Sequence, residues 1–330
     1  MRVLVTGHQG FIGPSVMRLL AEAGHEPVGK DIGYFKDTPA AQRWDVRTAT
    51  IDDVRGFDGI IHLAGLSNDP IGELDKELTL EINGRASVRL AELAKEAGVS
   101  RFAFASSCSV YGAAEGDDVT ENAPLKPVTA YAESKAIAEE GLANLASRDF
   151  VTVALRNATA YGASPNMRSD LVVNNLVGYA LTEGEVKITG DGTPWRPLVH
   201  QEDIARAAIA ALDAPADSVS GKAFNVGVPG ENYQVKDLAE IVREATGCPV
   251  SIGSTSPDAR SYRVNFDAYY TAAPSFSPVW RVPAGVAQVR DFYASVGLTA
   301  EAFKGPKYVR LAQIKELMAA ARIDADLRWV

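Results

Sequence analysis

The sequence predicts an α/β fold with a doubly wound parallel sheet, and two observations lead to that expectation. Short runs rich in Val, Ile, Leu, Phe and Ala alternate with longer helical patterns between residues 3 and 156. A glycine-rich turn joins the first of these runs to the first helical pattern. Strands that alternate with helices are connected by crossovers, and the resulting parallel sheet is buried on both faces.

The elements of the first half are expected in the following order. Buried strands are predicted at 3–6, 26–31, 59–64, 102–106 and 151–156, where the runs are short and apolar. Helices are predicted at about 12–24, 73–97 and 129–148. We therefore expect residues 1–162 to form one domain.

The second half, residues 163–330, has shorter elements punctuated by Pro and Gly. Helices are predicted near 168–182, 202–213 and 235–246, and strands at 185–189, 196–199 and 224–226. Apolar residues at helical spacing in 307–323 predict a C-terminal packing helix. We expect a smaller α/β substrate-binding region that is interleaved with the first domain.

Composition narrows the classes of function. The chain has 330 residues, 46% of them apolar, and a formal net charge of −9, which argues against nucleic acid as a partner. No apolar run is long enough to cross a membrane. Two cysteines and four histidines show no disulfide or metal-ligand spacing, so we expect a cytoplasmic protein without a metal.

Glycines recur at the turn that follows the first strand, as Gly7, Gly10 and Gly13 with Phe11 and Ile12 between them. The first makes the turn, the second lets the backbone approach a pyrophosphate, and the third lets helix and strand pack closely. Asp31 ends the second strand, where a carboxylate would accept from ribose hydroxyls and repel a 2′-phosphate. The glycine turn and the carboxylate at the end of the second strand together predict a Rossmann site for NAD. The alternative is a tight turn in a domain that binds no dinucleotide.

Tyr131 and Lys135 form a YxxxK pair on one face of a predicted helix. An ammonium near a phenol favours the phenolate, so the pair is suited to moving a proton. Ser107 follows a strand at the carboxyl edge of the sheet, where ligands bind in such folds. YxxxK alone arises by chance in many helices, but together with the glycine turn these residues predict hydride chemistry at a hydroxyl or ketone.

These motifs resemble the extended short-chain dehydrogenase/reductases, in particular those that modify nucleotide-diphosphate sugars. The likeness includes Asp45-Val46 after a third strand, His62-Leu63-Ala64-Gly65 on a fourth, Asn83, and the stretch 106–112. It implies that Asp45 and Val46 contact the adenine and that Leu63, Ala64 and Gly65 lie along NAD. It also implies that Ser107 is the catalytic serine and that Asn83 stiffens the site.

The resemblance extends to the substrate. Asn175 matches a position that contacts the diphosphate of a sugar nucleotide, and Arg196 matches an arginine that meets nucleotide or phosphate. Arg260 is a candidate for a second phosphate contact. The resemblance therefore implies a nucleotide-diphosphate sugar as the small-molecule substrate.

The positions after Ser107 bear on the reaction. Sugar-nucleotide 4,6-dehydratases carry Asp-Glu there, whereas this chain has Cys108-Ser109, and Cys108 reads as a buried, inert thiol. We therefore expect a 4-epimerase that passes through a 4-keto sugar. The alternatives are a ketosugar reductase or dehydrogenase on the same scaffold, and a non-catalytic NAD-binding regulator.

A homodimer is also expected, because the two long helices of the first domain carry extra apolar or small residues and the resemblance implies a four-helix interface. These residues are Leu74, Leu78, Ile82, Ala132, Ala136 and Leu142.

Overall fold

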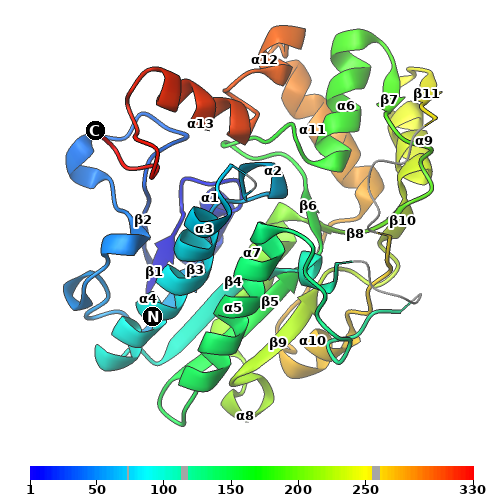
Figure 1. Ribbon diagram of the computed structural model, residues 1–330. Helices are drawn as coiled ribbons and strands as arrows, with labels where there is room; N and C mark the ends of the chain where they lie inside the picture. Colours follow the sequence, from blue (N-terminus) through cyan, green and yellow to red (C-terminus); the bar gives the residue numbers. More distant parts are fainter. Residues whose placement is uncertain (73, 113–117, 255–260) are drawn as a thin grey trace.

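A six-stranded parallel sheet forms the centre of the computed structural model, which describes residues 1–72, 74–112, 118–254 and 261–330 (Figure 1). Its strand order is β2–β1–β3–β4–β5–β9, and every neighbouring pair is parallel. The predicted doubly wound sheet is confirmed. The strands are β1 (Arg2–Thr6), β2 (Glu26–Lys30), β3 (Gly59–His62), β4 (Arg101–Ser107), β5 (Val151–Asn157) and β9 (Lys222–Val226).

Both faces of this sheet are covered because side chains alternate along each strand. Leu4 of β1 packs with helices α4 (Ala86–Glu96) and α5 (Ala130–Leu145) on one face. Its neighbours Val3 and Val5 pack with α1 (Gly13–Glu22) and α7 (Gln201–Asp213) on the other. The three positions are fully buried.

The last strand of the sheet comes from the second half of the chain. The strand expected at 224–226 in the smaller region is β9, which pairs with β5 in the register Asn157↔Val226. The main sheet is therefore completed by residues far along the sequence from its first five strands.

A strand expected before Asp45 does not form. Only an isolated bridge joins Asp31 to Arg43, and Asp45 instead caps the 3₁₀ turn η2 (Val46–Thr48) by accepting from the Arg47 amide. The segment contains Pro39, which has no amide hydrogen to donate to a sheet. His62 consequently ends the third strand and not a fourth.

The second half builds its own core around α6 (Val172–Glu183), α9 (Val235–Thr246) and α11 (Val282–Ser295). A three-stranded sheet, β10–β8–β6, and a two-stranded sheet, β11–β7, lie beside these helices. Their strands are β6 (Thr159–Tyr161), β7 (Val186–Ile188), β8 (Trp195–His200), β10 (Asn232–Gln234) and β11 (Val250–Ile252). Helices α6, α7 and α9 were predicted from the sequence, whereas α11 and strands β6, β10 and β11 were not.

Short elements complete the chain. They are the 3₁₀ turns η1 (Ala40–Gln42), η3 (Ile51–Asp53) and η5 (Cys108–Tyr111), the π-helical turn η4 (Leu80–Arg85), and the helices α2 (Asp69–Gly72), α3 (Lys76–Thr79), α8 (Ala216–Val219), α10 (Asp267–Ala272), α12 (Ala300–Lys304) and α13 (Arg310–Ala319). In the ranges that the structure describes, no helix combines the length and apolar character needed to span a bilayer.

The C-terminal helix α13 packs on the first half of the chain, beside the segment that follows β2 (Figure 1). Ile314 and Leu317 belong to the same buried cluster as Leu4 and Leu90. The expected packing role is confirmed, but α13 also reaches the functional site described below.

Candidate active site

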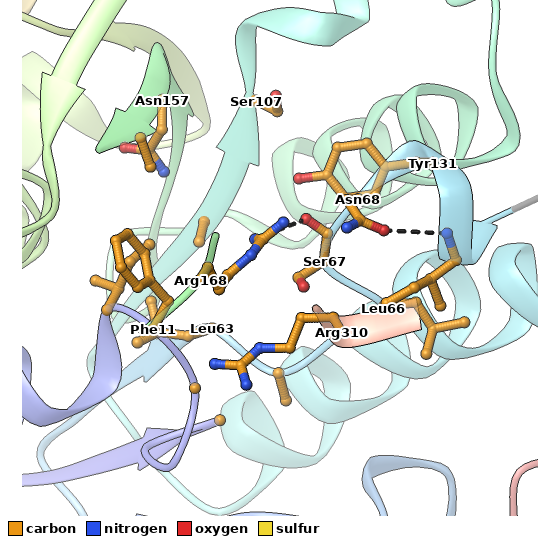
Figure 2. Close-up of a pocket in the computed structure, with 18 of the residues that line it drawn as sticks. Phe11, Leu63, Leu66, Ser67, Asn68, Ser107, Tyr131, Asn157, Arg168 and Arg310 are labelled. Atoms are coloured by element: carbon orange, nitrogen blue, oxygen red, sulfur yellow. Dashed lines mark hydrogen bonds between the residues drawn. The ribbon is translucent and has the colours of Figure 1, made fainter. Parts of the chain in front are cut away.

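A cavity of about 540 Å³ lies at the carboxyl edge of the main sheet and is lined by both halves of the chain (Figure 2). Its wall includes the glycine turn and the ends of β2, β3, β4 and β5 on one side. Arg168, Arg196 and Arg310 of the second half line it as well. This is the edge at which ligands bind in doubly wound sheets.

The glycine turn forms a cradle that side chains would fill. Gly7 has φ +73°, and a Cβ there would lie 2.7 Å from the Ala64 amide nitrogen. A Cβ on Gly13 would lie 2.3 Å from the carbonyl oxygen of His8, so glycine is needed for α1 to begin this close to the turn. Pro14 occupies the first turn of α1 as expected. The cradle and the helix N-terminus together fit the pyrophosphate of a dinucleotide.

Asp31 lies at the end of β2 in the wall of the same cavity and is 8% exposed. Its two carboxylate oxygens accept backbone hydrogen bonds from Gln9, at 3.0 Å, and from Gly33, at 2.8 Å. Because a carboxylate offers about four acceptor sites, it retains capacity for ribose hydroxyls. The residues present therefore fit NAD.

Asp45 and Val46 also line the cavity, and their contact with the adenine stays a prediction. The Asp45 carboxylate is held by the guanidinium of Arg47, with Nε 2.9 Å from Oδ1. Arg47 in turn donates to the carbonyl of Asp326 at 2.6 Å. The C-terminal residues are thus tied to this end of the site.

Ser107, Tyr131 and Lys135 are brought together from two elements. Ser107 is the last residue of β4, and Tyr131 lies in the first turn of α5, which Thr129 caps through the Ala132 amide. Lys135 is 5% exposed, and its Nζ donates to the carbonyl of Ala105 at 2.7 Å. All three residues line the cavity, and their catalytic roles stay predictions.

Tyr131 is not the phenolate that the sequence led us to expect. Burial raises the pKa of Tyr131 to about 12, with the Asp69 charge acting in the same direction and Arg168 and Ser107 acting against it. Burial lowers the pKa of Lys135 to about 8, against the effect of Glu139. Burial is the largest of these effects at Tyr131, so the phenol is protonated at neutral pH.

Two neighbouring predictions about the site wall are confirmed. Asn83 accepts from the Leu66 amide at 2.7 Å and donates to the Leu66 carbonyl at 3.0 Å, which fixes the segment after β3. Cys108 is 2% exposed and its thiol donates to the Arg156 carbonyl at 3.1 Å, while burial raises its pKa far above the ordinary value. This thiol has no free thiolate to act as a nucleophile.

The four residues predicted to bind the substrate are not all found at the cavity. Ser107 and Arg196 line it. Asn175 does not, and its amide donates instead to the Ser169 carbonyl at 3.1 Å. Arg260 lies outside the described residues.

Arg168 is a site residue for which the sequence suggested no role. Its guanidinium binds Asp170 with both Nε, at 2.9 Å, and Nη2, at 3.1 Å, and a longer contact reaches the Ser67 carbonyl (Figure 2). The signal available in the sequence was the stretch Asn166–Arg168, which has no clear counterpart in the resemblance.

Two buried polar atoms in the cavity wall lack partners within the described part of the chain. They are the amide oxygen of Asn157, at the end of β5, and the hydroxyl of Ser109, just after β4. A buried polar atom without a hydrogen bond is costly, so such atoms in a cavity wall indicate a polar ligand.

Comparisons with known proteins agree with this geometry. Residues 3–227 match the NAD dependent epimerase/dehydratase family. The chain is 32% identical over 268 residues to the UDP-glucose 4-epimerase of Mycolicibacterium smegmatis, covering 76% of this chain and 84% of the relative. It is 27% identical over 275 residues to that of Corynebacterium glutamicum, covering 76% and 82%.

A solved structure of MoeE5 in complex with UDP-glucose and NAD superimposes with a TM-score of 0.78 at 27% identity, covering 90% of this chain and all 100% of that one. The cradle at Gly7 and Gly13, the strand-end Asp31 and these similarities lead to one conclusion: the chain is an enzyme of the NAD-dependent epimerase/dehydratase family.

Proposed function

We propose that this enzyme is a 4-epimerase of a nucleotide-diphosphate sugar. The observation that carries the proposal is the convergence of Ser107, Tyr131 and Lys135 on a cavity that also contains a dinucleotide cradle. The relatives named UDP-glucose 4-epimerases support the same reaction. UDP-linked hexoses are therefore the first substrates that we propose.

The residues would act on the sugar as follows. Tyr131, once deprotonated, removes the proton of the C4 hydroxyl, and Ser107 holds the oxygen as the 4-keto sugar forms. Lys135 positions the cofactor ribose and keeps positive charge beside the phenol ring, whose centre is 5.6 Å from its Nζ. When bound, NAD⁺ supplies the acceptor and donor of the C4 hydride. The keto sugar presents its other face before Tyr131 returns the proton.

Elimination of water is disfavoured by the carboxylates of the cavity. Four carboxylates line the described wall of the cavity, and each accepts hydrogen bonds from protein donors. None is therefore available as the acid or the base of a dehydration. Asp31 accepts two backbone amides, Asp45 is paired with Arg47, Asp69 accepts from the Thr129 hydroxyl, and Asp170 is paired with Arg168. A 4-epimerase requires no such pair, because one group removes and returns the same proton.

The unpartnered atoms of Asn157 and Ser109 suit the sugar. Asn157 ends β5 and Ser109 follows β4, at the carboxyl edge that faces the cavity, and Ser107 and Asn157 are paired across the two strands. The sugar hydroxyls would donate to Asn157 Oδ1 and bond with Ser109 Oγ. Arg196 would meet the diphosphate of the same substrate.

We also propose a homodimer formed by the outer faces of α4 and α5. Three of the six residues that the sequence suggested for the interface, Ile82, Ala132 and Leu142, are buried inside the subunit. Val88 and Ile137 line a shallow groove between the two helices instead. Light scattering should give twice the mass of one chain, and Val88→Glu should give a single chain.

The test of the function is a substrate screen with the cofactor counted. The purified protein is denatured and its released nucleotide is assayed, while UDP-, GDP-, dTDP- and CDP-sugars are examined for products. Stoichiometric NAD and a C4 stereoisomer without net redox change would support the proposal. Consumption of NADH by a keto sugar would identify a reductase, and a 6-deoxy-4-keto product would identify a dehydratase; either would contradict the proposal.

A further inference from the structure

Arg310 is a buried cation at the first position of α13, and it lines the cavity from the C-terminal segment of the chain. Only 3% of the residue is exposed. Its side chain and that of Arg168 project into the same pocket (Figure 2). The roles described above for the glycine turn and for Ser107, Tyr131 and Lys135 do not require a cation at this position.

The position of Arg310 is set by contacts that lead directly to the glycine turn. Its Nη2 donates to the carbonyl of Asn166 at 2.7 Å, and Asn166 donates through its amide to the carbonyl of Gln9 at 2.8 Å. Ser164 makes a similar bond to the carbonyl of Phe11 at 2.7 Å. The guanidinium is therefore connected through Asn166 to the backbone of the glycine turn.

No ion pair in the described structure holds the Arg310 guanidinium, and the more distant charges of Asp170 and Asp31 offset its burial only in part. Within residues 1–72, 74–112, 118–254 and 261–330, no carboxylate lies at ion-pair distance from it, whereas Arg168 is paired with Asp170. Its other close contact is the Phe35 ring, 4.1 Å from Cζ. Burial and the charge of Arg168 lower its pKa to about 9, so it remains charged at neutral pH. A buried, unpaired charge is unfavourable and calls for an anion.

The surroundings indicate which anion would lie there. Ile314, one turn further along α13, lines the same cavity, and Gln313 donates to the Tyr34 carbonyl at 3.0 Å. Asp31, which the sequence predicts to bind the ribose, is close enough to influence the Arg310 charge. Arg310 thus lines the same cavity as Asp31 and the turn at Gly10, which is suited to a pyrophosphate.

We propose that Arg310 binds the pyrophosphate of NAD from the side opposite the glycine turn, so that the C-terminal segment 310–330 forms part of the cofactor site. This segment lies beyond the residues 3–227 that match the family. A planar guanidinium is suited to bind phosphate oxygens in pairs. The proposal does not depend on which sugar is the substrate.

The rest of the segment holds α13 against the residues that follow β2. The Tyr34 hydroxyl donates to the Leu327 carbonyl, and the Trp329 indole donates to the Ile32 carbonyl at 2.7 Å. Arg43 stacks on the Trp329 ring, with its Cζ 3.6 Å from the ring centre. These contacts, all within the protein, fix the C-terminal segment beside the cavity.

The experiment titrates protein freed of bound dinucleotide with NAD⁺, ADP, adenosine and UDP, by calorimetry for the phosphates and by NMR for adenosine. We expect Arg310→Gln to weaken the binding of NAD⁺ and ADP by about ten- to hundred-fold, which corresponds to the loss of a charge-assisted hydrogen bond. Arg310→Lys keeps the charge but not the planar guanidinium, so its affinity for NAD⁺ and ADP should fall less. Adenosine has no phosphate and should bind as before.

Arg322→Gln is the matched control, because it removes an exposed cation of the same segment that lies over Trp329 and outside the cavity wall. It should bind every ligand like the parent protein. Unfolding of the ligand-free Arg310→Gln protein should not occur at a lower temperature, since the change removes an unpaired buried charge.

Unchanged ADP affinity would overturn the proposal. So would a loss confined to UDP, which would assign Arg310 to the substrate, or an equal loss for adenosine with a lower unfolding temperature, which would assign it to packing.

Discussion

The Nζ of Lys135 lies 5.6 Å from the centre of the Tyr131 ring, yet its hydrogen bond goes to the carbonyl of Ala105 at 2.7 Å. Tyr131 and Lys135 both lie on α5, but the Lys135 side chain is thus also fixed by a hydrogen bond to β4. In this arrangement the two pKa values move in opposite senses, to about 12 for Tyr131 and about 8 for Lys135, because both groups are buried.

The buried ammonium of Lys135 should make stability depend on pH. Because its pKa is lower in the folded protein than in the unfolded chain, the charged form costs stability below pH 8, and this cost declines as the pH rises from about 8 toward the ordinary value of 10.5. Lys135→Met should therefore stabilise the ligand-free protein more at pH 7 than at pH 9, by about 1 kcal/mol. Urea unfolding of both proteins at the two pH values measures this difference. An equal gain at both would show that Lys135 titrates normally.

Tyr131→Phe should remove activity without removing the cofactor. The phenol oxygen is the only atom lost, and a positioned acid–base group contributes about 10²- to 10⁴-fold to a rate. We expect turnover to fall by that amount while the NAD content of the purified protein stays the same. Tyr179→Phe is the control, because Tyr179 packs edge-on against Phe303, 5.1 Å between ring centres, and does not line the cavity. Full activity in Tyr131→Phe would exclude the proposed role.

Asp31 should determine the choice between NAD and NADP. Its carboxylate faces the cavity with both oxygens already bound by backbone amides, which holds the charge in one place. Asp31→Asn keeps the shape and removes the charge, so NADH should bind about tenfold more weakly and NADPH should lose less or gain. Fluorescence titration with both cofactors gives the ratio. Asp53→Asn, outside the cavity wall and paired with Lys30, should leave the ratio unchanged.

The sequence allowed the sheet and one side of the site to be predicted because local signals specify them. Gly7, Gly13 and Asp31 are recognisable where they stand, since a close approach or a strand end requires that residue type. Arg310 could not be found in this way. It reaches the cavity only because α13 packs its Ile314 and Leu317 on the first half of the chain, a contact between residues far apart in the sequence. The pairing of residues 224–226 with β5 could not be predicted for the same reason, since it joins strands far apart in the sequence.

Asn157 offers a way to separate substrate binding from folding. Its amide oxygen is buried and unpartnered in the described structure, while its nitrogen makes one bond of 3.2 Å to the Ser106 carbonyl. Asn157→Leu, of similar size, removes the unpartnered oxygen, so the free energy of unfolding should change by less than about 1 kcal/mol or rise. If the sugar hydroxyls donate to that oxygen, KM for the sugar nucleotide should rise about tenfold with the NAD content unchanged.

Asn144→Leu, on the outer groove of α5 and outside the cavity wall, controls for the change of residue type. A KM equal to that of the parent protein would remove Asn157 from the substrate site, and a large loss of stability would show that its single bond to Ser106 matters for the fold.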